Sequence, residues 1–258
     1  MLLAFVPLIV ACGSTASKRP SGQGSLFTPS IASDSGHLAV GCGGTGGWSP
    51  SVMAAGLPGV LTQTQVQDAF TDLLADPKYR GELASSFLEE GPTTPWRVLR
   101  VDGDTYTLGL GRWTRKGPEN GATVFEMRGH TGSWAWSGGG DCHLAPVLSA
   151  GSEWVHLTTL RQGLDRQSTH PSVGVTEQEC ASGRDPRPFL GTPISKETST
   201  TVTVYWTATS PADNSSCVGR APVNVSLRLA SPLGQRKLLD GSTFPPTLVT
   251  RSSVAAGG

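Results

Sequence analysis

The sequence predicts an α+β module, with two helices and antiparallel strands, followed by an all-β, sandwich-like module. Two patterns predict this order. Apolar residues first recur at helical spacing, from Val66 to Leu74, and the period changes to two from Trp96 onward. Beyond that region only short alternating segments remain, separated by connections rich in Pro, Gly and Ser. We therefore place the α+β module at 37–150 and the sandwich-like module at 151–251.

The chain begins with an apolar run that ends in Ile9-Val10-Ala11-Cys12. Residues 2–11 are too few to cross a bilayer as a helix, which takes about 20 residues, and they fit the apolar core of an export signal. The last four residues of the run resemble the lipobox of bacterial lipoproteins, in which the Cys is acylated and becomes the first mature residue. This resemblance implies a signal peptide at 1–11 and a lipid on Cys12. It also implies attachment to the outer face of the cytoplasmic membrane, with the membrane itself as a partner.

The export signal lacks one usual element, because no Lys or Arg precedes the apolar run. Either the signal is atypical or translation starts upstream, and we expect the second. A chance Cys in an ordinary apolar N-terminus is the alternative to the lipoprotein hypothesis.

Residues 12–36 are predicted to be a flexible tether, because Ser, Thr, Gly and Pro dominate them. A coil of that length spans roughly 25–30 Å. Residues 252–258 are predicted to be a disordered tail.

The charge pattern argues against nucleic acid as a partner. The 20 basic and 20 acidic residues of the 258 balance to a net charge of zero and form no basic stripe. Arg outnumbers Lys, a bias typical of GC-rich genomes such as those of actinobacteria.

Besides Cys12, the chain has four cysteines: Cys42, Cys142, Cys180 and Cys217. An even number in an exported chain predicts two disulfides, with three connectivities open. We favour Cys42–Cys142 and Cys180–Cys217, because each pair then stays within one module. Each bond would stabilise the fold by roughly 3–5 kcal/mol. A catalytic Cys142 beside His143 and a metal cluster are weaker alternatives, since no Cys-x-x-Cys occurs and neighbours on a strand point to opposite faces.

The α+β module is expected to begin with two helices. Thr64-Gln65-Val66-Gln67 matches a capping box, and the helix that follows should stop at Asp76. Pro77 suits the first position of a second helix, which Gly91 would end. Strands should follow, joined first by an Asp102-Gly103 hairpin turn. We place them at 96–101, 106–110, 123–127 and 133–137.

The second module should contain five strands, at 154–160, 172–177, 201–207, 223–229 and 235–239. The fourth is the clearest: Val223, Val225, Leu227 and Leu229 alternate with polar residues, which predicts one buried and one wet face. Trp154 and Trp206 are predicted to belong to the sandwich core.

Two segments of the second module, Cys180–Pro186 and Pro232–Gly241, carry a further resemblance. They are similar to a module of uncharacterised secreted and lipid-anchored proteins of high-GC Gram-positive bacteria. The resemblance supports the predicted location. It implies no activity for any residue.

No motif with a defined chemistry passes its context test. Gly41–Gly46 matches a dinucleotide-binding loop, but Gly47-Trp48-Ser49-Pro50 follows in place of a helix, so a glycine-rich loop around a disulfide is the better interpretation. The nucleophile-elbow, zinc-protease, phosphate-loop and EF-hand patterns do not occur. We therefore assign no catalytic residue, no metal ligand and no cofactor.

Trp134 and Trp136 are the candidate ligand residues, because they share one face of a predicted strand and aromatic faces stack on sugar rings. Core packing is the alternative role. We expect a non-catalytic binding or structural component of the cell envelope, with an envelope glycan or a surface protein as partner. The alternative function is an envelope hydrolase with a site assembled from dispersed residues, for which Asp141, His143 and His130 are the candidates.

Overall fold

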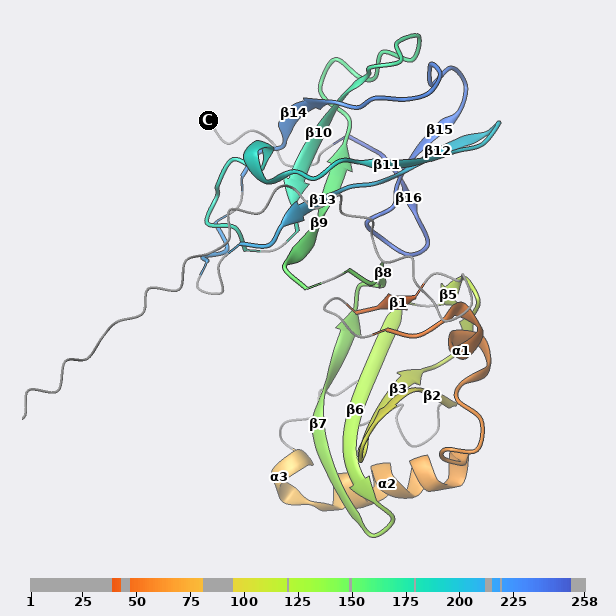
Figure 1. Cartoon of the computed structure of the whole chain (residues 1–258). Coiled ribbons are helices and arrows are strands. Elements are labelled where there is room, and N and C mark those ends of the chain that lie inside the picture. The colour runs from red at the N-terminus through yellow and green to blue at the C-terminus, as the bar shows by residue number, and fades with distance from the viewer. Residues whose placement is uncertain are drawn as a thin grey trace, which may run out of the picture.

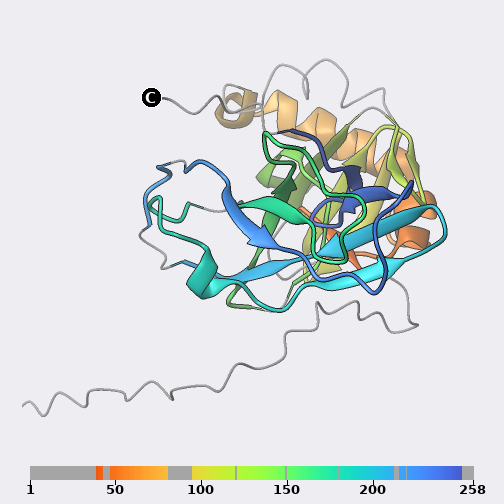
Figure 2. The same ribbon diagram turned by 90° about the horizontal axis from the view of Figure 1, so that it is seen from above.

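The computed structural model describes residues 39–42, 47–80, 95–119, 121–148, 150–178, 180–211, 215–218 and 220–251. This described part of the chain is mostly β, with several antiparallel sheets and three α-helices. Figure 1 shows two lobes: the lower one holds β1 to β8 and the helices, and the upper one holds β9 to β16. Figure 2 shows the same arrangement from above. Among the described residues, no helix has the length and apolar character needed to cross a membrane.

A four-stranded antiparallel sheet forms the centre of the lower lobe, in the order β2-β3-β6-β7. Its strands are β2 (Trp96–Asp102), β3 (Thr105–Leu110), β6 (Ala122–His130) and β7 (Ser133–Cys142). The four expected strands are present, and the last runs five residues beyond the predicted 137. The first hairpin turns at Gly103-Asp104, one residue later than predicted, because Asp102 pairs with Thr105. Gly103 has a φ of +60°, a conformation that favours glycine.

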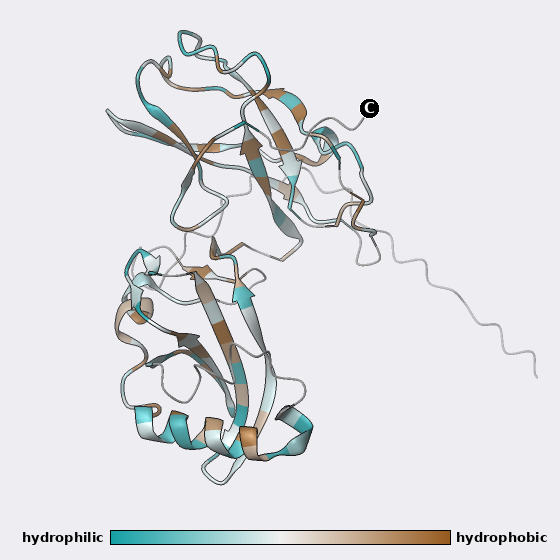
Figure 3. Ribbon diagram, turned by 180° about the vertical axis from the view of Figure 1, so that it is seen from behind, coloured by the Kyte–Doolittle hydropathy of each residue, from teal (hydrophilic) through white to brown (hydrophobic). Residues whose placement is uncertain are grey.

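The helices are α1 (Pro50–Ala55), α2 (Gln63–Ala75) and α3 (Pro77–Arg80). The capping box of α2 uses Thr62 and Gln65, so the predicted cap at Thr64 was two residues too late. Polar and apolar residues alternate in bands along α2 (Figure 3), and the helix buries Val66, Ala69, Phe70 and Leu73. Phe70 packs against the sheet. The Phe70 ring lies 4.7 Å from that of Trp96 and 4.5 Å from that of Phe125.

Two short ribbons close the top of the lower lobe. In one, β1 (Val40–Gly41) pairs with β8 (Ala145–Pro146); in the other, β4 (Trp113–Thr114) pairs with β5 (Gly117–Pro118). A second apolar cluster contains Val40 and Trp113 of these ribbons, Met53 of α1, and Leu99 of the sheet.

The upper lobe contains two four-stranded sheets, in the orders β13-β9-β10-β14 and β11-β12-β15-β16. The strands of the first are β9 (Ser152–Thr158), β10 (Ser172–Glu177), β13 (Thr207–Thr209) and β14 (Val223–Ser226). Those of the second are β11 (Ile194–Glu197), β12 (Thr201–Tyr205), β15 (Lys237–Asp240) and β16 (Thr247–Leu248). All neighbours are antiparallel except β12 and β15, which run parallel. A 3-10 turn, Arg187–Phe189, is the teal coil of Figure 1.

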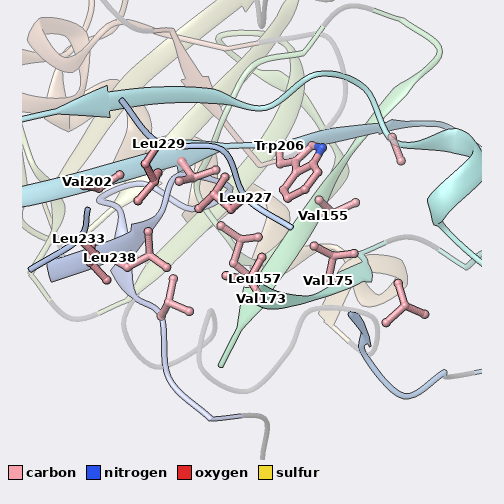
Figure 4. Packing of buried hydrophobic residues seen from close by; sticks show 14 residues of the cluster. Val155, Leu157, Val173, Val175, Val202, Trp206, Leu227, Leu229, Leu233 and Leu238 are labelled. Atoms are coloured by element: carbon pink, nitrogen blue, oxygen red, sulfur yellow. The ribbon is translucent and has the colours of Figure 1, made fainter. Parts of the chain in front are cut away.

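The main core of the upper lobe contains side chains from both sheets (Figure 4). The predicted strand 201–207 is divided at Trp206, because β12 lies in one sheet and β13 in the other. Trp206 is buried in this core, as predicted. The alternation after Val223 is confirmed in burial, since Leu227 and Leu229 are buried and Arg228 is exposed. Each fully buried aliphatic side chain contributes about 1.5–3 kcal/mol relative to exposure.

Trp154 lies outside that core, so its predicted place was wrong. Its β9 neighbour Val155 points into the core, and Trp154 therefore points to the opposite side. There it packs in a separate cluster with Leu148 and Tyr205, and its indole N–H donates to the Pro146 carbonyl at 2.8 Å. The cluster joins the upper lobe to the segment that leaves the lower one. Burial raises the pKa of the Tyr205 phenol.

The two disulfides join Cys42 to Cys142 and Cys180 to Cys217, which is the pairing favoured from the sequence. Two disulfides indicate an oxidising, extracytoplasmic location.

Several predictions lie outside the described residues: the signal peptide and lipobox, the tether, the tail, Gly43–Gly46, and the part of the second helix after Arg80.

Candidate functional site

The upper lobe contains a cavity of about 200 Å³ at the end of β10. Its walls come from that strand and from two loops, one formed by 180–186 and a second that contributes residues 217, 218, 220 and 221. The lining residues are Val175, Thr176, Glu177, Gln178, Cys180, Ala181, Gly183, Arg184, Pro186, Cys217, Val218, Arg220 and Ala221. Val175 and Glu177 are deeply buried, whereas Val218 and Arg220 are exposed. The first pair therefore forms the inner wall and the second pair the rim.

The two loops are fastened to each other at several points. Besides the Cys180–Cys217 disulfide, the Ser182 N–H donates to the Ser216 carbonyl, and the Ser216 N–H donates to Ser182 Oγ, both at 2.8 Å. Ser182 has a φ of +51° and is the one described residue other than glycine with a positive φ. Such a conformation persists where the surroundings hold it, and it is common at binding sites. The cavity wall is therefore covalently and conformationally fixed.

Arg184 links the loop to two carboxylates at the inner wall. Its Nε and Nη2 lie 2.8 and 2.5 Å from Glu177 Oε1, and Nη2 lies 3.3 Å from Glu153 Oε1. The Glu153 side chain is 0 % exposed and the Glu177 side chain 5 %. Nη2 also donates to the Thr209 carbonyl, and the guanidinium stacks on the Phe189 ring at 3.8 Å. Buried carboxylates require such a partner, because their desolvation is otherwise costly.

A second set of charges lies at the rim. Arg187 donates to both oxygens of Asp185, and this hydrogen bond is the main reason why the pKa of Asp185 is lowered to about 2. Asp185 in turn raises the pKa of Arg187. Arg220 Nη2 lies 4.0 Å from Asp185 Oδ2, too far for a hydrogen bond, and Nη1 donates to the Gly183 carbonyl at 3.1 Å. Arg220 is therefore the less engaged of the two rim arginines.

Ser242, His156 and Asp240 also lie together. These are the residue types of a catalytic triad, but their arrangement is not that of a triad. Asp240 Oδ2 and Ser242 Oγ both lie 3.2 Å from the same nitrogen of His156, Nδ1. A triad needs the two partners on opposite ring nitrogens and a nucleophile that substrate can reach, and Ser242 is 1 % exposed. Asp240 also accepts the N–H groups of Leu157 and Ser242, at 3.0 and 2.9 Å. Asp240 thus holds β15 of one sheet against β9 of the other.

The predicted ligand residues Trp134 and Trp136 lie on one face of β7, and both are partly buried against the cluster under α2. The Trp134 ring meets the Tyr106 ring edge to face at 5.7 Å, and the Trp136 indole N–H donates to the Gly138 carbonyl at 2.6 Å. These contacts fit core packing. Sugar stacking on the two rings stays a prediction.

The hydrolase candidates do not form one site. His130 pairs with Ser133 at one end of β7, whereas Asp141 lies at the other end, about 25 Å away along the strand. His143 follows the disulfide cysteine at that far end, and all three candidates are exposed. Among the described residues, no group of three or more His, Cys, Asp or Glu could hold a metal ion.

No protein-family model, no curated protein and no solved structure matches the chain.

The sequence pointed to the disulfide cysteines of the cavity wall, Cys180 and Cys217, but not to the cavity itself. Arg184 and Pro186 were noted only within the Cys180–Pro186 resemblance, and Glu153, Glu177 and Arg220 were not singled out. One signal was available: Glu153 and Glu177 stand at positions of β9 and β10 whose side chains point inward, where a carboxylate needs a partner. Nothing in the sequence pointed from them to Arg184.

Proposed function

We propose that the protein is a lipid-anchored, extracytoplasmic binding protein of the cell envelope, without catalytic activity, and that the cavity holds its ligand. The single observation that supports this role is the cavity wall, which combines a disulfide, the strained Ser182 and a nearly buried Glu177 carboxylate. Binding sites are typically concave, apolar and largely pre-formed, with a few fixed polar groups.

The anchor and the domain organisation belong to the same proposal. A lipid on Cys12 and a tether at 12–36 would keep the body near the outer face of the cytoplasmic membrane, and the two disulfides fit that compartment. The division into an α+β module at 37–150 and a sandwich-like module at 151–251 is supported by α1 to α3, which precede the β2-β3-β6-β7 sheet, and by the two packed sheets of the upper lobe.

Blocking the cavity mouth tests this function. Ala221 lines the cavity and is exposed, so Ala221→Phe should fill the opening without disturbing the core. The probe is the low-molecular-weight fraction of a cell-envelope extract, incubated with the purified protein and analysed by mass spectrometry after washing. The natural chain should retain a compound that the variant does not. Ala230→Phe, at an exposed alanine that does not line the cavity, is the matched control and should retain it. Equal retention by Ala221→Phe would refute the site.

A further inference from the structure

The cavity volume limits the ligand to a small molecule. Cavities for drug-sized ligands measure about 300–1,000 Å³, and this one measures about 200 Å³. A glycan chain would reach the interior only with a terminal group. A single small metabolite, of the size of an amino acid, fits the space.

The inner wall offers a carboxylate to such a ligand. Both contacts of Arg184 with Glu177 use Oε1, and Oε2 has no hydrogen-bond partner among the described residues. Arg184 also serves Glu153 and the Thr209 carbonyl, so its positive charge is divided. The Glu177 side chain is 95 % buried, and in such surroundings a charge attracts its counter-charge more strongly than in water. The inner wall therefore suits an ammonium group.

The rim offers the opposite charge. Arg220 lines the cavity. Within the described part of the chain, its guanidinium makes one hydrogen bond, to the Gly183 carbonyl, and lies 4.0 Å from Asp185 Oδ2. Arg187 donates to the Asp185 carboxylate through Nε and Nη2. Arg220 therefore keeps N–H groups that can donate to a ligand carboxylate. Val175 of the inner wall, Val218 of the rim and Ala181 also line the cavity and offer apolar contacts.

We infer that the cavity binds a small zwitterion, an aminocarboxylate such as a free amino acid, with its ammonium at Glu177 and its carboxylate at Arg220. This inference rests on the proposed function and names the chemical class of its ligand. An amine alone or a carboxylate alone would satisfy only one end of the site. The site therefore selects for both charges in one small molecule.

Isothermal titration calorimetry of the full chain with glycine, L-alanine, D-alanine and β-alanine tests the inference. At least one of the four should bind with one molecule per chain. Propionate is alanine without its ammonium group, and ethylamine is alanine without its carboxylate. Each should bind at least roughly tenfold more weakly than the amino acid, because each lacks one charged hydrogen bond. Equal binding of propionate or ethylamine would overturn the inference.

Two variants separate the rim from the rest of the surface. Arg220→Gln should weaken binding of the amino acid by roughly tenfold. It should leave the affinity for ethylamine unchanged, because ethylamine has no carboxylate to contact the rim. Arg228→Gln, an exposed arginine outside the cavity, should change neither. Unchanged amino-acid affinity in Arg220→Gln would contradict the inference. Because Glu177 also holds Arg184, the comparison of ethylamine with propionate, and not a Glu177 variant, tests the inner carboxylate.

The two levels of the proposal fail separately. If none of the four amino acids binds while Ala221→Phe still abolishes retention of an extract compound, the zwitterion is wrong and the cavity function stands. If the extract experiment also shows no difference between the natural chain and Ala221→Phe, both are wrong.

Discussion

At the scale of single residues, Arg184 is the centre of the candidate site. It contributes to the inner wall of the cavity, and it is the partner that the structure gives to Glu177 and one that it gives to Glu153. Removing one member of a buried ion group leaves the others desolvated, and this typically costs 3–5 kcal/mol. The residue is thus as important for stability as for the shape of the site.

Arg184→Met should therefore lower the free energy of unfolding by about 3–5 kcal/mol, measured by urea denaturation near neutral pH. Arg228→Met, which changes an exposed arginine, should stay within about 0.5 kcal/mol. Equal effects of the two variants would contradict the role of Arg184.

The Asp185–Arg187 pair at the rim predicts a pH effect. The Arg187 hydrogen bond lowers the pKa of Asp185 from 3.8 to about 2, so the pair adds stability above about pH 4 and loses it as the pH falls towards 2. Arg187→Gln should return the pKa of Asp185 towards 3.8, measured by carboxyl NMR titration. An unchanged low pKa in the variant would show that Arg187 is not the cause.

At the scale of elements, periodicity predicted strands and helices well, and their ends less well. The hairpin of β2 and β3 and the strand after Val223 follow from the alternation of apolar and polar residues along the chain. That alternation can be seen directly in the sequence. The place of Trp154 depends on which side of β9 packs against the second sheet and on what covers the opposite side. The alternation of residues along one strand does not contain that information. The cavity was missed for the same reason, since β9, β10 and two loops assemble it.

The helix cap gives a direct test of an element boundary. Thr62→Ala removes the side chain that accepts the Gln65 N–H, so it should destabilise the fold by about 1 kcal/mol. Thr64→Ala, inside the first turn and exposed, should have no cost beyond about 0.5 kcal/mol. Thermal unfolding of the two variants compares the cap in the structure with the cap that the sequence pattern favoured. A larger loss in Thr64→Ala would contradict the structure.

At the scale of the whole molecule, the two disulfides close loops of very different length. Cys42–Cys142 spans 100 residues and Cys180–Cys217 spans 37. In the chain-entropy model these loops correspond to about 5 and about 4 kcal/mol of stability. The first bond ties β1 to the end of β7 in the lower lobe, and the second forms part of the cavity wall.

Removing each bond should therefore separate stability from binding. The double variant Cys42→Ala/Cys142→Ala should lose more stability in urea denaturation, and it should keep ligand retention as long as it is folded. Cys180→Ala/Cys217→Ala should lose less stability and should lose retention of the extract compound, because its loop wall is no longer fixed. Retention that survives the second pair of substitutions would show that the disulfide does not shape the site.

We propose that this protein is anchored outside the cytoplasm at Cys12, and its two disulfides fit that location. Intact mass spectrometry of the protein purified from a native membrane fraction tests it most directly. We predict the mass of residues 12–258 plus acyl chains, minus the four hydrogens of two disulfides, and we predict that Cys12→Ala is lost from the membrane. An unmodified mass, or a mass that shows free thiols, would contradict the anchor or the oxidising compartment.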